Sequence, residues 1–209
     1  MYGIIFRYRQ SFVALVLSLI LSIQLSAGEK DSSRSLKFIF GAGYGYYFNT
    51  IKTIRGEKFI NVRPSFSGKL MWQPEYRVRI GIESGYYEFY SDSRIESGNN
   101  REKYTAKLNV VPLFLSFAMK MAKHIDINFA TGGALLNFRV ISGSPTAGMV
   151  RGETLSLSDF AGGVTWHTKL GSRFEAGSEI KYLYLGKTGD SHLSMFLNLG
   201  YKIIGRKVK

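Results

Sequence analysis

The chain has 209 residues, of which 45% are hydrophobic, 14% aromatic and 21% charged, and it carries a formal net charge of +13 with no cysteine. The apolar content excludes a disordered chain, and a mean hydropathy of -0.04 excludes a bundle of membrane helices, each of which needs about 20 consecutive apolar residues. Without cysteine, a disulfide scaffold, a thiolate zinc site and a cysteine nucleophile are also excluded. One ordered domain of modest size remains.

The N-terminal segment has the layout of a secretory signal peptide. Two arginines precede an apolar stretch over 12–21, and small residues follow at 26–28. We therefore predict a signal peptide over 1–28 and export across the inner membrane of a bacterium. An uncleaved anchor helix is the alternative, although the apolar stretch is short for one. Export also places the positive charge out of reach of cytoplasmic nucleic acid, so we predict no nucleic-acid partner.

The rest of the chain alternates repeatedly between apolar and polar or small residues. Over 36–48, for example, the even positions are mostly aromatic and the odd positions mostly glycine or polar. Successive side chains of a strand point to opposite faces, so this period of two predicts strands, each with one apolar face, and no helix. In chain order the predicted strands are 36–48, 60–72, 76–86, 104–118, 124–140, 154–166, 173–185 and 192–203.

The connections between these strands alternate in length. The tight ones lie near Pro74, Met121 and Leu170, and the others, mostly longer and polar, are 49–58, 91–103, 142–153 and the shorter 186–191. Short turns at one end and long loops at the other are typical of an outer-membrane barrel, whose turns face the periplasm.

We therefore predict an all-β fold, an eight-stranded antiparallel up-and-down transmembrane β-barrel preceded by a signal peptide, in the bacterial outer membrane. The barrel should cover 36–203, with a periplasmic N-terminal tail over 29–35 and a basic periplasmic C-terminal tail over 204–209.

Glycine and aromatic residues indicate that the apolar face points outward, toward lipid. Glycine weakens strands, so a solvated face has no need of it, whereas the tight lumen of an eight-stranded barrel does. Tyrosine and tryptophan gather at the ends of the apolar faces, as two girdles at the headgroup levels would. The predicted girdles are Trp72, Tyr76, Trp166 and Tyr201 on the turn side and Tyr44, Tyr46, Tyr86, Tyr182 and Tyr184 on the loop side. A soluble lipocalin with the opposite polarity is the alternative.

The sequence resembles the small bacterial outer-membrane barrels of the outer-membrane protein A, W and X type. The resemblance covers roughly residues 36–203 and is carried by Gly41-Ala42-Gly43-Tyr44-Gly45-Tyr46, Gly81-Ile82-Glu83-Ser84-Gly85-Tyr86 and Gly200-Tyr201-Lys202-Ile203. The last segment is similar to the family's terminal Gly-Tyr-basic-Phe strand, with Ile203 in place of the aromatic residue. The resemblance implies recognition by the barrel assembly machinery during insertion.

Charged residues on the polar faces predict a network inside the lumen. Its predicted members are Lys37, Arg63, Lys69, Arg77, Arg79, Lys107, Arg173, Lys181 and Lys202 with Glu83, Asp126, Asp159, Glu175 and Glu179. Because buried charges must be paired, we expect a packed network that fills the barrel. A narrow anion-favouring path is the alternative, since cations are in excess.

No motif predicts a catalytic centre, a cofactor or a metal site. His124 and His167 belong to predicted turns and His192 to the opposite rim, so they do not share a metal. His192 and Ser194 form a His-x-Ser pair like that of some lipid A deacylases, but their phase turns them toward the lumen instead of the lipid.

The predicted role is structural or one of surface interaction through the outer loops, for a monomer whose partners are outer-membrane lipid and lipopolysaccharide. A narrow pore or carrier for small or hydrophobic solutes is the first alternative, and a lipid A-modifying barrel enzyme the second. The outer loops are too balanced in charge to predict strong lipopolysaccharide capture. A cationic cluster at the periplasmic end, either solvated or in contact with phospholipid headgroups, comprises Lys120, Lys123, Lys169, Arg206, Lys207 and Lys209.

Overall fold

The computed structural model describes residues 33–48, 62–74, 77–96, 102–142 and 149–207. The predicted signal peptide and the girdle residue Tyr76 lie outside these ranges. No helix within them is long and apolar enough to cross a membrane.

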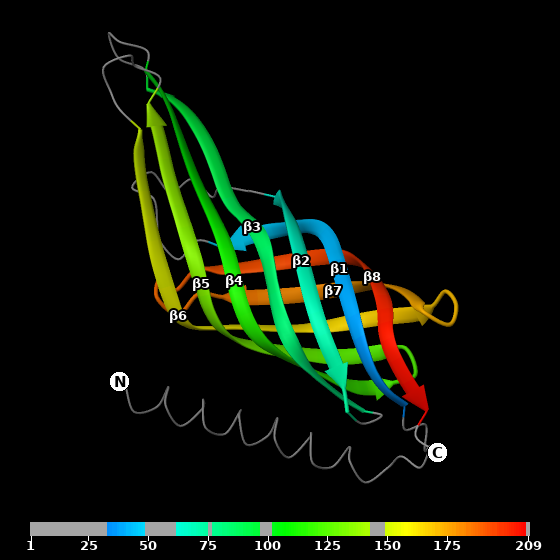
Figure 1. The fold of residues 1–209 in the computed structure, drawn as a ribbon. Helices are drawn as coiled ribbons and strands as arrows, with labels where there is room; N and C mark the ends of the chain where they lie inside the picture. The colour runs from blue at the N-terminus through cyan, green and yellow to red at the C-terminus, as the bar shows by residue number, and fades with distance from the viewer. Residues whose placement is uncertain (1–32, 49–61, 75–76, 97–101, 143–148, 208–209) are drawn as a thin grey trace, which may run out of the picture. The chain divides into compact units, whose positions relative to one another are not determined.

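Eight antiparallel strands form one closed barrel (Figure 1). They are β1 (Ser33–Phe48), β2 (Val62–Gln73), β3 (Val78–Glu96), β4 (Glu102–Ala122), β5 (Ile125–Ser142), β6 (Val150–Lys169), β7 (Phe174–Tyr184) and β8 (Ser191–Lys207). Each strand pairs with the next in sequence, and β8 pairs with β1 to close the sheet. This topology confirms the predicted eight-stranded up-and-down barrel.

The strands are longer than the alternating pattern predicts. β1 and β8 pair from Ser33 opposite Lys207 onward, so both continue past the predicted limits of 36 and 203. The predicted loop 91–103 is wrong for most of its length, because β3 and β4 remain paired as far as Glu96 opposite Glu102. A hairpin in water has no apolar face to bury, so backbone pairing continues there without the period of two.

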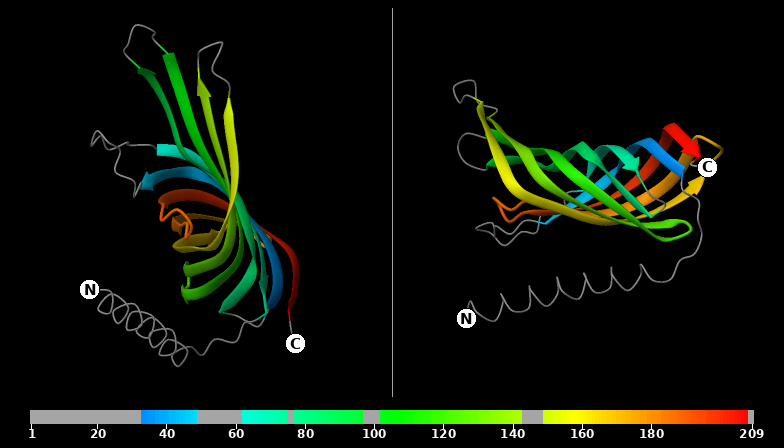
Figure 2. Two further views of the ribbon diagram at one scale, coloured as in Figure 1. Left: turned by 90° about the vertical axis from the view of Figure 1, so that its left-hand side faces the viewer. Right: turned by 60° about the horizontal axis from the view of Figure 1, so that its bottom comes forward.

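Four strands continue beyond their neighbours at the loop end (Figures 1 and 2). β2 pairs with β3 only as far as Tyr87, and β7 pairs with β6 only as far as Phe160. We call the part of β3–β6 from Glu88 and its cross-strand partners Asn109, Asn137 and Glu153 outward the protruding sheet, which comprises residues 88–96, 102–109, 137–142 and 150–153. Within the described chain its two outer strands, β3 and β6, each have a neighbour on one side only.

The outer face of the barrel is apolar. Leu197 is 72% exposed, Leu113 67% and Ile180 56%, values that a soluble protein would not sustain around its circumference. Of the predicted girdle residues, Tyr44, Trp72, Tyr86, Trp166, Tyr182 and Tyr201 are exposed and Tyr46 and Tyr184 half-buried. The apolar outer face confirms the transmembrane barrel. The lipocalin alternative is wrong, because it requires the opposite polarity.

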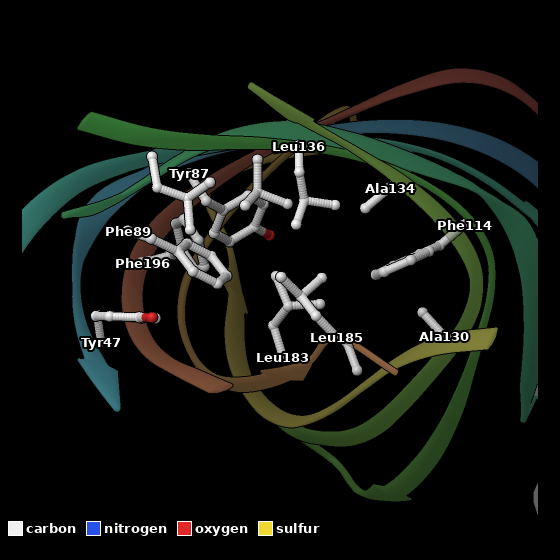
Figure 3. Packing of buried hydrophobic residues seen from close by; sticks show 13 residues of the cluster. Tyr47, Tyr87, Phe89, Phe114, Ala130, Ala134, Leu136, Leu183, Leu185 and Phe196 are labelled. Atoms are coloured by element: carbon white, nitrogen blue, oxygen red, sulfur yellow. The ribbon is translucent and has the colours of Figure 1, made fainter. Parts of the chain in front are cut away.

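Buried side chains pack inside the barrel (Figure 3). A buried hydrophobic cluster occupies the half nearer the long loops, and it includes Tyr47, Tyr87, Phe89, Phe114, Leu136, Leu183, Leu185 and Phe196. The charged network lies next to this cluster, toward the short turns.

Candidate functional site

Four charged side chains meet at the centre of the lumen. Lys69 comes from β2, Glu83 from β3, and Glu179 and Lys181 from β7, and each is at most 4% exposed. We call them the central quartet. Side chains along a strand alternate between the two faces of the sheet, and all four residues occupy positions that face the lumen.

The central quartet is an alternating ring of charges. Lys69 Nζ lies 2.6 Å from Glu179 Oε1 and 3.9 Å from Glu83 Oε2. Lys181 Nζ lies 3.5 Å from Glu179 Oε1 and also binds Glu83. Two positive and two negative charges therefore cancel inside the barrel, so the quartet supplies no net field that would draw an anion through.

Amide side chains complete the hydrogen bonding of Glu179. Asn198 Nδ2 donates to its Oε2 at 3.1 Å, and Asn128 Nδ2 donates to its Oε1 at 3.3 Å. Asn128 also lies 2.5 Å from Thr165 Oγ1. Glu179 thus joins strands β2, β5, β7 and β8 across the lumen, which is the behaviour of a packed structural network.

A second set of charges lies nearer the short turns. Arg79 binds Asp126, whose Oδ2 is also 3.1 Å from His167 Nδ1, and Lys37 Nζ binds Glu175 Oε1 at 2.6 Å. Between these groups and the central quartet lies a cavity of about 30 Å³. It has room for about two water molecules.

His192 and Ser194 lie inside the lumen, as their phase predicts. His192 Nδ1 is 2.8 Å from Ser194 Oγ, and its ring stacks on Phe89 at 4.8 Å between ring centroids. A Cβ at Gly45 would come within 1.9 Å of the imidazole, so the ring occupies the space that a side chain at Gly45 would need. Both members of the pair are almost fully buried. The pair is therefore enclosed in the lumen, away from the lipid-facing surface.

Asp159 is buried but stands apart from the ion pairs. A bulge at Ser158, whose φ is 69°, turns Asp159 into the lumen. Its Oδ1 accepts hydrogen bonds from Ser156 Oγ at 2.5 Å and from the backbone N–H of Gly186 at 2.8 Å. Asp159 therefore anchors the loop between β7 and β8.

The remaining predicted members of the network lie at the rims or outside. Arg63 and Lys202 are half-buried, and Arg63 donates to the backbone carbonyl of Ser91. Arg77 is half-buried just before β3, and Arg173 is exposed at the turn before β7, with Nη1 3.5 Å from Tyr201 Oη.

The prediction for Lys107 is wrong, because this residue lies on the outer face. Its strand partners are Ser91 and Arg139, whereas the neighbouring Leu108 is buried in the lumen. β4 carries apolar residues on both faces, since it contributes to the hydrophobic cluster inside and to the lipid-facing surface outside. From Lys107 to Val110 the strand does alternate, but with the opposite polarity, because Leu108 and Val110 face the hydrophobic cluster.

The other predicted sites are placed as follows. Lys123 and Lys169 of the basic periplasmic cluster are exposed, and Lys120 is half-buried. His124 and His167 are neighbours, with His124 Nδ1 3.0 Å from the carbonyl of His167. Within the described ranges no three His, Asp or Glu side chains group as a metal site would require.

No protein-family model and no curated protein matches the sequence. Among solved structures, the chain is similar to two crystal structures of Ail, the attachment invasion locus protein of Yersinia pestis, one of them in complex with the heparin analogue sucrose octasulfate. The TM-scores are 0.52 for the complex and 0.50 for the other, each at 12% identity, covering 81% and 83% of this chain and 99% and 100% of those chains. A major outer membrane protein from Thermus thermophilus has a TM-score of 0.49 at 11% identity, covering 80% of this chain and 99% of that chain.

At this level of identity the likenesses show the fold alone. The chain has the fold of the small bacterial outer-membrane barrels, which confirms the predicted fold class. The apolar outer face agrees with the predicted location in an outer membrane.

Proposed function

We propose that this protein is an outer-membrane barrel with a closed lumen, and that it acts by presenting the protruding sheet to binding partners outside the cell. The observation that carries the proposal is the continuation of β3–β6 beyond the other four strands. Paired strands that extend outward from the membrane offer a rigid surface, which lowers the entropic cost of binding.

The edges of the protruding sheet support strand addition as the mode of binding. A strand edge carries unpaired N–H and C=O groups that an extended segment of a partner can pair with. At the base of each edge a cationic side chain donates a hydrogen bond to one backbone carbonyl. Arg63 binds the carbonyl of Ser91 on β3, and Lys187 Nζ lies 3.3 Å from the carbonyl oxygen of Leu155 on β6. These contacts protect the edges next to the barrel, and the portions farther out carry no such contact among the described side chains.

The filled lumen favours this role over a pore. The hydrophobic cluster and the neutral central quartet lie in series along the barrel, and the cavity between charged groups is about 30 Å³. Enclosure of His192 and Ser194 likewise favours a protein without a catalytic centre. The similarity in fold to a protein whose name describes attachment is consistent with a surface role.

A cell-adhesion assay tests the proposal. Cells of a non-adherent laboratory strain that express the full chain are applied to plates coated with heparin or with a mixture of extracellular-matrix proteins. We expect several-fold more bound cells than for the empty vector on at least one coating. Replacing 93–105 with Asn-Gly joins the paired residues Asp92 and Ala106 by a two-residue turn and should return binding to the vector level.

A matched control separates the sheet from its loop. Replacing only 97–101 with Asn-Gly joins Glu96 to Glu102 and keeps the paired strands, so this variant should still bind. Loss of binding in the control as well would assign the role to the loop, and an absence of binding by the full chain would overturn the proposal. Heat-dependent gel migration verifies that each barrel is folded.

A further inference from the structure

The outer face of β3–β6 changes character in three successive rows, which the strand register defines. The first row is apolar, with Val111, Leu135 and Leu155 side by side on β4, β5 and β6. Two residues farther along each strand, about 7 Å toward the loop end, lies a polar row, and the next row is basic. The polar row is Glu88, Asn109, Asn137 and Glu153, and the basic row is Ser91, Lys107, Arg139 and Arg151.

The basic row places like charges directly opposite one another. Lys107 is the strand partner of Arg139, and Arg139 is the strand partner of Arg151. Arg151 has a carboxylate partner, with Nη2 2.5 Å from Glu153 Oε1, whereas the ion pairs among the described residues include neither Lys107 nor Arg139. Like charges that face each other across strands destabilise a sheet, so this arrangement favours a bound anion.

A surface hollow lies beside these two cations. Its volume is about 290 Å³, and its walls are Tyr86, Glu88, Lys107, Asn109 and Arg139. Lys107, Arg139 and the amide of Asn109 offer hydrogen-bond donors to a phosphate, and Glu88 offers an acceptor to a sugar hydroxyl. The volume is close to that of the smaller ligand pockets in proteins, about 300 Å³.

The position of the hollow identifies the kind of anion. It lies directly above exposed apolar residues, with Leu135 39% and Leu155 56% exposed, and beside the girdle residue Tyr86. A ligand at this boundary can lay acyl chains on the apolar row while its charged headgroup meets the basic row. We propose that the hollow binds a phosphate of lipid A, the phosphorylated glycolipid of the outer leaflet.

Native mass spectrometry of the full chain in detergent tests this site. The probes are bis-phosphorylated lipid A, the same lipid A without phosphate, and heparin. Lys107→Gln with Arg139→Gln should weaken binding of bis-phosphorylated lipid A at least tenfold. Lys123→Gln with Lys169→Gln removes the same charge from exposed positions at the opposite end and should change it less than twofold.

Two further variants keep the test independent of folding. Arg139→Lys retains the charge and should retain most of the affinity, and Glu88→Gln removes the opposing carboxylate and should strengthen binding about threefold by an electrostatic gain of under 1 kcal/mol. Equal loss in both double variants, equal binding of dephosphorylated lipid A, or preferential binding of heparin at Lys107 and Arg139 would each overturn the proposal. Because the adhesion variant replaces only 93–105 and leaves Lys107 and Arg139 in place, either proposal can fail without the other.

Discussion

Charge pairing at single residues accounts for how the lumen can hold several buried charges. Each carboxylate of the central quartet contacts both lysines, and Glu179 receives two amide hydrogen bonds in addition. A buried ion pair is costly to desolvate, and its stability depends on full hydrogen bonding of both partners. Removal of one member therefore leaves the others uncompensated in the buried interior of the barrel.

Glu179→Gln should destabilise the barrel by about 3–5 kcal/mol, because Lys69 and Lys181 lose their shared partner. Glu153→Gln is the control, since the Arg151–Glu153 pair is about half exposed and should be worth less than about 1 kcal/mol. Urea unfolding in lipid vesicles measures both free energies of unfolding. Equal effects of the two substitutions would show that the quartet is no more important than a surface pair.

Residue identities alone predicted which strands carry lumen charges, but not which charges meet. Lys69 and Glu179 are far apart in sequence, and they become neighbours only because the closed sheet brings β2 and β7 to face each other across the lumen. The isolated position of Asp159 depends on a one-residue bulge at Ser158. No sequence period reports such a bulge, because it shifts the phase without changing composition.

At the scale of whole strands, the period of two was informative wherever one face meets lipid and the other meets charge. It located all eight strands, and it failed in two places for two reasons. At the loop end of β4 the apolar residues Leu108 and Val110 face the lumen, so the rule that polar residues face inward gave Lys107 the wrong face. Beyond Glu88 and Asn109 neither face of the sheet meets lipid or core continuously, so the paired hairpin was taken for a loop.

The position of the protruding sheet outside the membrane can be tested by cysteine labelling, because the chain has no native cysteine. Gly152→Cys in the protruding sheet and Gly171→Cys at a short turn are both at exposed positions where an added Cβ meets no atom within 4 Å. On intact cells a membrane-impermeant maleimide should label Gly152→Cys only. Gly171→Cys should react after the outer membrane is permeabilised. The reverse pattern would invert the topology.

At the scale of the whole molecule, both the lumen and the outer wall change in character along the barrel. The lumen holds an ionic zone toward the short turns and a hydrophobic zone toward the loops. The outer wall passes from an apolar belt to a polar row and a basic row, which form the base of the protruding sheet. In the account we propose, the apolar belt meets lipid tails, the polar and basic rows meet headgroups, and the farther part of the protruding sheet meets water. The activity we propose resides on the outside of the wall.

The most direct measurement of this account is the environment of the outer wall. A bimane label on Leu197→Cys, at a position 72% exposed on β8, is compared with the same label on Gly152→Cys in vesicles that contain phospholipid brominated on its acyl chains. Bromine quenches fluorophores that it touches, so the account predicts strong quenching at position 197 and little at position 152. The opposite result would be a label at position 197 that is quenched by a water-soluble quencher and not by brominated lipid. That result would contradict a barrel whose apolar face meets lipid.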